Sequence, residues 1–206
     1  MTDQIETPQI YLVTPPEFEL SSFPNTLKRV LDGVETACLR LSLATHDEDR
    51  LMRATDVIRE VANSVDVAMV IDTHVLLAER LGLDGVHLPD GARTVRFARK
   101  TLGPDAIVGT GNGTSRHDGM NAGEAGADYV SFGPIGGALG DGELAELDLF
   151  RWWSEVIEVP VVAEGGLTED NVRSLAPFTD FFAIGEEIWR EEDPLAALKR
   201  LTAAMS

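Results

Sequence analysis

Residues 126–135, Gly126-Ala127-Asp128-Tyr129-Val130-Ser131-Phe132-Gly133-Pro134-Ile135, decide the fold of this chain. Gly126 suits the left-handed turn that closes a helix. Tyr129 to Phe132 is aromatic and apolar enough for a short buried strand. Gly133-Pro134 then forces the chain to turn. The stretch therefore predicts a helix end, a strand and an exit into a glycine-rich loop.

Nearly the same pattern, a short strand followed by a turn at glycine or proline, recurs at Gly82 to Pro89 and at Val161 to Thr168. Short apolar runs alternate with longer amphipathic stretches along the rest of the chain, which indicates alternating strands and helices. The expected strands are 10–14, 37–43, 67–71, 85–88, 106–109, 128–132, 161–163 and 181–184. The expected helices are 47–63, 75–81, 92–102, 147–156, 168–175 and 194–205, with Thr168 as an N-cap and Pro194 in a first turn.

Eight strands without a linker or a break in composition predict an α/β fold, a single (β/α)8 TIM barrel that spans residues 1–206 as one domain. An open, doubly wound sheet is the alternative. The glycine-rich and acidic segment 138–146 is the longest candidate for a flexible loop.

The net charge of −18 argues against nucleic acid as a partner, because phosphates would be repelled. No apolar run is long enough to span a bilayer, and Met1 to Pro8 does not resemble a signal peptide, so we expect a cytoplasmic protein. The single cysteine, Cys38, excludes an internal disulfide and is expected to be a small buried hydrophobe. The sequence leaves a homo-oligomer open.

In a TIM barrel the active site lies where the strands end, so the strand ends nominate the functional residues. Arg40 interrupts an apolar strand, and alternation places it on the inner face with Cys38. Its planar guanidinium suits phosphate oxygens, which makes it a candidate catalytic residue and anion clamp. An internal ion pair with Asp72 or Glu164 is the alternative, and both can hold at once.

Asp72 and Asp90 could hold a magnesium ion, which takes one or two carboxylates together with phosphate oxygens, and Asp72 is also a catalytic candidate. Asp72 could instead cap the helix that follows it. His87 is expected to face the interior, as a hydrogen-bonded structural imidazole or a catalytic one. The remaining substrate-binding candidates are polar residues and glycines at strand ends: Ser42, His74, Asn112, Ser131, Gly133, Gly136, Gly137, Gly165, Gly166 and Gly185.

Gly165-Gly166 before a helix forms a reasonable phosphate cradle from backbone N–H groups. Barrels often place such a site after strands seven and eight. Glu164, Glu186 and Glu187 argue against it, because a carboxylate that faces the cradle would repel phosphate.

The chain resembles the thiamine phosphate synthase family, which includes the related thiazole tautomerases. The resemblance covers nearly the whole chain, and its most specific parts are Asp84-Gly85-Val86-His87-Leu88 and Gly126 to Ile135. It implies a barrel that joins a pyrimidine methyl diphosphate to a thiazole phosphate and releases diphosphate. It also implies magnesium and cationic groups that stabilise the leaving diphosphate.

Several positions differ from the family pattern. Cys38 and Ser42 stand where the family has glutamine and lysine, and Thr73 replaces a metal-binding aspartate. Segment 136–141 lacks the usual threonines and lysine, and Gly185-Glu186 replaces a valine-serine pair. Arg40 is then the one clearly retained cation, and Pro134 stands, as in synthases, where a tautomerase would have histidine.

Three functions stay open on these grounds. The first is a divergent thiamine phosphate synthase that acts on small phosphorylated substrates. The second is a thiazole tautomerase-like enzyme. The third is a non-catalytic barrel that binds a phosphorylated ligand or a partner.

Overall fold

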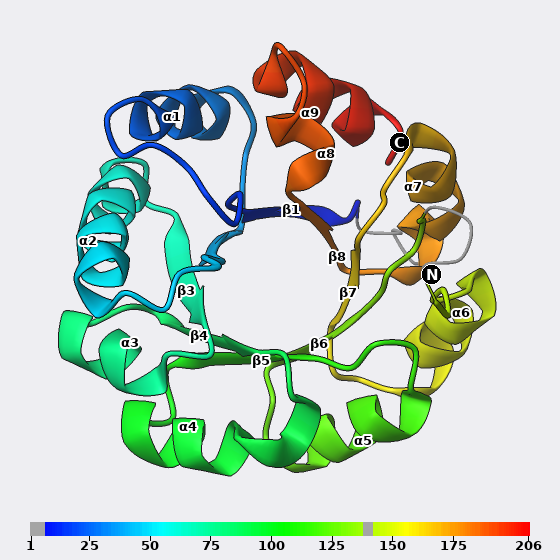
Figure 1. Ribbon diagram of the computed structural model, residues 1–206. Coiled ribbons are helices and arrows are strands. Elements are labelled where there is room, and N and C mark those ends of the chain that lie inside the picture. The colour runs from blue at the N-terminus through cyan, green and yellow to red at the C-terminus, as the bar shows by residue number, and fades with distance from the viewer. Residues whose placement is uncertain (1–6, 138–141) are drawn as a thin grey trace.

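The computed structural model describes residues 7–137 and 142–206, in which eight parallel strands close into a barrel in sequence order, β1 to β8. Helices surround this ring of strands (Figure 1). The strands are β1 Gln9–Val13, β2 Cys38–Leu41, β3 Ala68–Asp72, β4 Gly85–Leu88, β5 Ile107–Gly111, β6 Tyr129–Phe132, β7 Val161–Glu164 and β8 Phe181–Ile184. The (β/α)8 barrel is confirmed, and the open sheet is excluded because β8 pairs with β1.

The helices agree with the amphipathic pattern over most of the chain. They are α1 Phe23–Gly33, α2 Glu48–Ser64, α3 Val75–Leu81, α4 Val95–Leu102, α5 Arg116–Glu124, α6 Leu147–Val156, α7 Glu169–Leu175, α8 Glu186–Trp189 and α9 Pro194–Ala203. Thr168 caps α7 through its hydroxyl and Pro194 opens α9, as predicted. No helix in these described parts is long and apolar enough to span a membrane.

Some expected elements need correction. The helix expected over 92–102 is a short 3-10 turn, Gly91–Arg93, followed by α4. Asp72 caps no helix, because α3 has His74 at its N-cap position without a side-chain bond. Of the expected flexible loop 138–146, residues 138–141 lie outside the described part of the chain.

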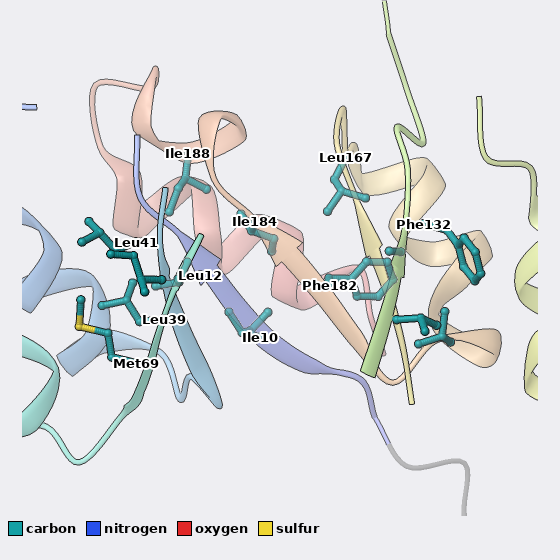
Figure 2. Packing of buried hydrophobic residues seen from close by; sticks show 14 of the residues in the cluster. Ile10, Leu12, Leu39, Leu41, Met69, Phe132, Leu167, Phe182, Ile184 and Ile188 are labelled. Carbon is teal, nitrogen blue, oxygen red and sulfur yellow. The ribbon is translucent and has the colours of Figure 1, made fainter. Parts of the chain in front are cut away.

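Alternation along the strands separates two sets of buried side chains. Those that point outward meet the helices and form the larger apolar core, and Figure 2 shows Leu39, Leu41 and Met69 gathered there on one side of the barrel wall. Those that point inward form a smaller cluster that includes Tyr11, Cys38 and Tyr129. The inward set also carries the polar side chains of the barrel, so the strand alternation itself brings the candidate residues together.

A chain of hydrogen bonds crosses the barrel interior. The Tyr11 and Tyr129 hydroxyl oxygens lie 2.5 Å apart, and the Tyr129 hydroxyl lies 2.9 Å from Nδ1 of His87. Burial, followed by the charge of Arg40, lowers the pKa of His87 to about 3. His87 is therefore neutral near neutral pH, and these contacts support the structural interpretation of this residue.

Gly109 on β5 leaves the space that the Tyr129 ring occupies. A Cβ at Gly109 would lie 1.8 Å from Cζ of Tyr129, whereas a Cβ at Gly111 on the same strand would meet Nε2 of His87 at 3.4 Å. We expect Gly109→Ala to lower the free energy of unfolding by about 3 kcal/mol, as overpacking of a dense core does. Urea unfolding measures this, with Gly111→Ala as the control, which should cost less than about 1 kcal/mol. Equal losses in the two variants would contradict the packing explanation.

Candidate functional site

A cavity of about 480 Å³ opens at the carboxyl ends of the strands. Its wall comes from β1, β2, β7 and β8, from the loops after β6, β7 and β8, and from α8 and the residue that follows it. The lining residues are Val13, Arg40, Gly133, Pro134, Glu164, Gly165, Gly166, Ala183, Gly185, Glu186, Glu187 and Arg190. Five of the predicted site residues, Arg40, Gly133, Gly165, Gly166 and Gly185, thus share one cavity.

Arg40 lies at the base of this cavity between two carboxylates. Its Nη2 donates to Oε2 of Glu164 at 3.0 Å, and its Nε lies 3.4 Å from Oδ1 of Asp72. The side chain is 11% exposed. Its Nε and Nη1 are buried without a hydrogen-bond partner among the described residues. The expected ion pair is therefore confirmed. Because Nε faces Asp72, Nη1 is the nitrogen that keeps spare donor capacity for an anion.

The two carboxylates respond differently to this environment. Burial alone would raise the pKa of Glu164, but Arg40 and the hydrogen bond from Ser131 outweigh it and hold that pKa below its usual value. Burial raises the pKa of Asp72, although Arg40 and a hydrogen bond with Ser42 act in the opposite direction. Glu164 is thus the firm counter-ion of Arg40, and Asp72 is the more easily protonated partner.

Ser131 acts through Glu164 instead of lining the cavity. Its hydroxyl donates to Oε1 of Glu164 at 2.8 Å, which leaves Oε2 for Arg40. The Ser131 side chain is buried. Together the hydrogen bond and the ion pair fix the Glu164 carboxylate and, through it, the orientation of the Arg40 guanidinium.

The loops after β6 and β7 touch through their backbones. The amide N–H groups of Ile135 and Gly136 donate to the carbonyl oxygen of Gly165 at 2.8 and 3.0 Å. A Cβ at Gly136 would lie 2.4 Å from the backbone carbonyl oxygen of Gly166. A Cβ at Gly133 would lie 2.3 Å from the backbone carbonyl oxygen of Glu164. These glycines are thus required by close backbone approach, and Gly137 next to them is exposed.

The amides of the loops after β7 and β8 are already bonded to a side chain. The backbone N–H of Leu167 donates to Oε1 of Glu187 at 3.1 Å, and that of Gly185 donates to Oε2 at 2.9 Å. Glu187 lies half-buried in the cavity wall. The Gly165-Gly166 cradle expected from the sequence therefore has a carboxylate at its edge.

Other predicted site residues lie apart from this cavity. Asp90 and Asn112 line a second cavity of about 420 Å³, and His74 lines a third of about 530 Å³. The Asp90 carboxylate accepts a hydrogen bond from the Thr94 hydroxyl, and Oδ1 of Asn112 is buried without a described partner. Part of the predicted set thus divides among three cavities. The predicted residues that line none of these three are Ser42, Asp72, His87, Ser131, Gly136 and Gly137.

A magnesium ion would find few ligands in the described parts of the chain, where no group of three or more His, Cys, Asp or Glu side chains is arranged to hold a metal. Oδ1 of Asp72 is nevertheless a buried carboxylate oxygen without a hydrogen-bond partner there. Thr73, at the position where the family pattern has aspartate, is exposed and adopts a left-handed backbone with φ 66°. Asp72 fits a cation that arrives with a diphosphate and takes most of its ligands from it.

The sequence matches the family described as thiamine monophosphate synthase over residues 10–186. The chain belongs to this family. It is 37% identical over 201 residues to thiamine-phosphate synthase of Rhodospirillum centenum, covering 96% of this chain and 97% of that one. It is also 37% identical over 204 residues to thiamine-phosphate synthase of Hyphomonas neptunium, covering 95% and 92%.

A solved structure, thiamine phosphate pyrophosphorylase from Pyrococcus furiosus, has the same fold. It superposes with a TM-score of 0.83 and 22% identity, over 98% of this chain and 96% of that chain. The resemblance to the thiamine monophosphate synthase family, drawn first from two motifs, therefore extends to the sequence of nearly the whole chain.

Sequence interpretation missed one residue of the cavity and the contacts of another. Arg190 lines the cavity, which adds a second cation to Arg40, the one retained from the family pattern. Arg190 directly follows the short helix α8, and its position six residues after the end of the last strand could have nominated it. Glu187 was expected to repel phosphate if it faced the cradle. It lines the cavity, and its bonds to two backbone amides could not be read from the sequence.

Proposed function

We propose that this chain is a thiamine phosphate synthase that couples a hydroxymethylpyrimidine diphosphate to a thiazole phosphate and releases diphosphate. In this reaction the bond between the pyrimidine methylene carbon and the diphosphate oxygen breaks, and that oxygen keeps the electron pair. The thiazole nitrogen supplies the electrons of the new carbon–nitrogen bond. The chief support is the sequence match to the family over residues 10–186, together with a cavity at the expected end of the barrel.

Arg40 would stabilise the charge that develops on the leaving diphosphate. Its Nε faces Asp72, whereas its Nη1 has no hydrogen-bond partner among the described residues and would be the donor to a phosphate oxygen. Donors that are already oriented stabilise a developing charge without reorganisation during the reaction. Glu164 and Ser131 hold the guanidinium in place, and exposed Arg190 adds a second positive charge at the rim.

Magnesium is part of the proposal, with Asp72 as the residue that would hold it. Asp90, the second ligand expected from the sequence, lines a different cavity. When bound, the ion would neutralise part of the diphosphate charge as a Lewis acid. Oδ1 of Asp72 accepts no hydrogen bond from the described residues but lies 3.4 Å from Nε of Arg40, so a cation there would sit beside that guanidinium. Burial raises the pKa of this carboxyl, and the positive charge of a bound cation would favour its ionised form.

The proposal is tested by incubating the purified protein with both phosphorylated precursors and Mg²⁺. We expect thiamine phosphate and diphosphate in equal amounts, measured by conversion of the thiamine product to a fluorescent derivative and by a coupled diphosphate assay. A chelator should stop the reaction, and added Mg²⁺ should restore it. Absence of product from a folded protein would exclude the synthase function.

The same experiment separates the alternatives. Binding of thiazole phosphate without turnover would favour a non-catalytic barrel, and conversion of the thiazole compound alone would favour a tautomerase. Pro134, which lines the cavity where a tautomerase would have histidine, supports the synthase. We assign the reaction to the cytoplasm as part of the proposal, because charged phosphorylated substrates do not cross a bilayer freely.

A further inference from the structure

The Glu187 carboxylate accepts hydrogen bonds from two backbone amides at the edge of the cavity. These amides belong to Leu167, in the loop after β7, and to Gly185, directly after β8. Glu187 lies in the short helix α8, which follows β8 and packs beside the mouth of the barrel. One side chain thus joins the two loops through both of its oxygens.

These two loops and a short extra helix are where TIM barrels frequently bind phosphate. Here the same elements surround Gly165, Gly166 and Gly185 in the wall of the cavity. A phosphate in this place would accept hydrogen bonds from the amides that Glu187 now occupies. A carboxylate and a phosphate are both anions and both acceptors, so they compete for the same donors.

Glu187 forms no direct ion pair with a cationic side chain in the described parts of the chain, although Arg40 and Arg190 line the same cavity. Within residues 7–137 and 142–206, Arg40 pairs with Glu164 and Asp72, and no ion pair includes Glu187. Its neighbour Glu186 lines the same cavity and is exposed. A phosphate that entered near Glu187 would therefore meet a carboxylate without a direct ion-pair partner as well as occupied donors.

We propose that Glu187 is a specificity-determining residue that competes with the phosphate of the acceptor substrate. It thereby lowers the preference of the site for a phosphorylated thiazole over the corresponding unphosphorylated alcohol. This inference rests on the proposed function for the identity of the acceptor. The competition itself concerns binding and is measured without turnover.

The first test measures the affinity of the protein for inorganic phosphate and for thiazole phosphate by calorimetry. Glu187→Gln removes the charge but keeps the shape of the side chain, and Glu187→Ala also frees both amides. We expect each variant to bind either ligand about tenfold more tightly, because hydrogen bonds to a charged group carry energies of this order. If Glu187→Ala does not fold, Glu187→Gln carries the test.

Glu186→Gln is the matched control, since it removes the same charge from the same rim without releasing an amide. Its affinity for phosphate should rise less than about threefold, as expected for a screened surface charge. Unchanged or weaker phosphate binding in both Glu187 variants would overturn the inference and make Glu187 a structural tie between the loops. An equal gain in Glu186→Gln would also overturn it.

Turnover supplies the second test. The ratio of kcat/KM for the phosphorylated acceptor to that for the alcohol should rise about tenfold in Glu187→Gln, mostly through KM. A purely structural role would lower both values together and leave the ratio unchanged. If no variant forms product and phosphate still binds more tightly, the proposed function fails but the competition stands.

Discussion

Arg40→Ala should lower the rate of thiamine phosphate formation by about 10²–10³-fold, the usual effect of losing one oriented donor to a developing charge. The variant loses the guanidinium whose Nε and Nη1 have no hydrogen-bond partner among the described residues. It should also bind inorganic phosphate and thiazole phosphate much more weakly. Steady-state kinetics and calorimetry measure the two effects, and unchanged phosphate affinity would refute the role of Arg40 as an anion clamp.

The same substitution should destabilise the fold, because it leaves Glu164 and Asp72 without their shared counter-ion. Removing one partner of a buried ion pair costs about 3–5 kcal/mol. Arg173→Ala is the control: Arg173 is 59% exposed and pairs with Asp170 one turn away. That change should alter the free energy of unfolding by less than about 0.5 kcal/mol and leave the rate unchanged.

A double variant separates stability from binding. Arg40→Ala with Glu164→Gln removes the charge that Arg40→Ala leaves uncompensated, so part of the lost unfolding free energy should return. Product formation should stay low, because the anion clamp is still missing. Recovery of activity together with stability would show instead that Arg40 acts only as a structural counter-ion.

The pH dependence of stability should follow from the lowered pKa of Glu164. A carboxyl whose pKa is lower in the folded state contributes stability above its unfolded pKa and loses it as the pH falls through the folded value. The Arg40–Glu164 pair therefore stabilises the fold at neutral pH and weakens in acid. Asp72, whose pKa is raised, opposes this trend. The net acid response is then smaller than that of an isolated ion pair.

Most of the barrel could be predicted from the sequence because its strands are short apolar runs, four of which end in or directly before glycine. Helix α1 was missed, since the periodic stretch 23–33 follows a segment rich in proline and polar residues. Helix α5 was also missed, because Gly119 and Gly123 interrupt it. Glycine at position 119 leaves space for the Phe132 ring, because a Cβ there would lie 2.7 Å from Phe132. Tertiary packing therefore decides this helix against the low helix propensity of glycine.

The site residues could be predicted where alternation along a strand determines which way a side chain points. They could not be predicted where the conformation of a loop determines it. Arg40 and its two acidic partners followed from the inward face of the barrel. The bonds of Glu187 depend on how the loop after β8 turns into α8, which no periodicity specifies. Asp90 and Asn112 line a different cavity from Arg40, and this separation likewise depends on the conformation of the loops after β4 and β5.

Gly166→Ala should lower the rate of product formation by about 10²-fold, because displacing a substrate-binding loop by about 1 Å has effects of this size. A Cβ at Gly166 would lie 2.2 Å from the carbonyl oxygen of Gly136, so the loops after β6 and β7 must separate. The residue also has φ 68°, a left-handed conformation that alanine adopts only under strain. The free energy of unfolding should fall by about 3 kcal/mol.

Gly82→Ala isolates the backbone contribution. Gly82 ends α3 with φ 63°, close to that of Gly166, but a Cβ there has no heavy atom within 4 Å. This control should lose about 1 kcal/mol of stability and keep its full rate. Kinetics and urea unfolding on the two variants together decide whether close loop contact or backbone strain accounts for the loss. If Gly166→Ala lost no more activity than Gly82→Ala, the contact between the two loops would have no part in holding the substrate.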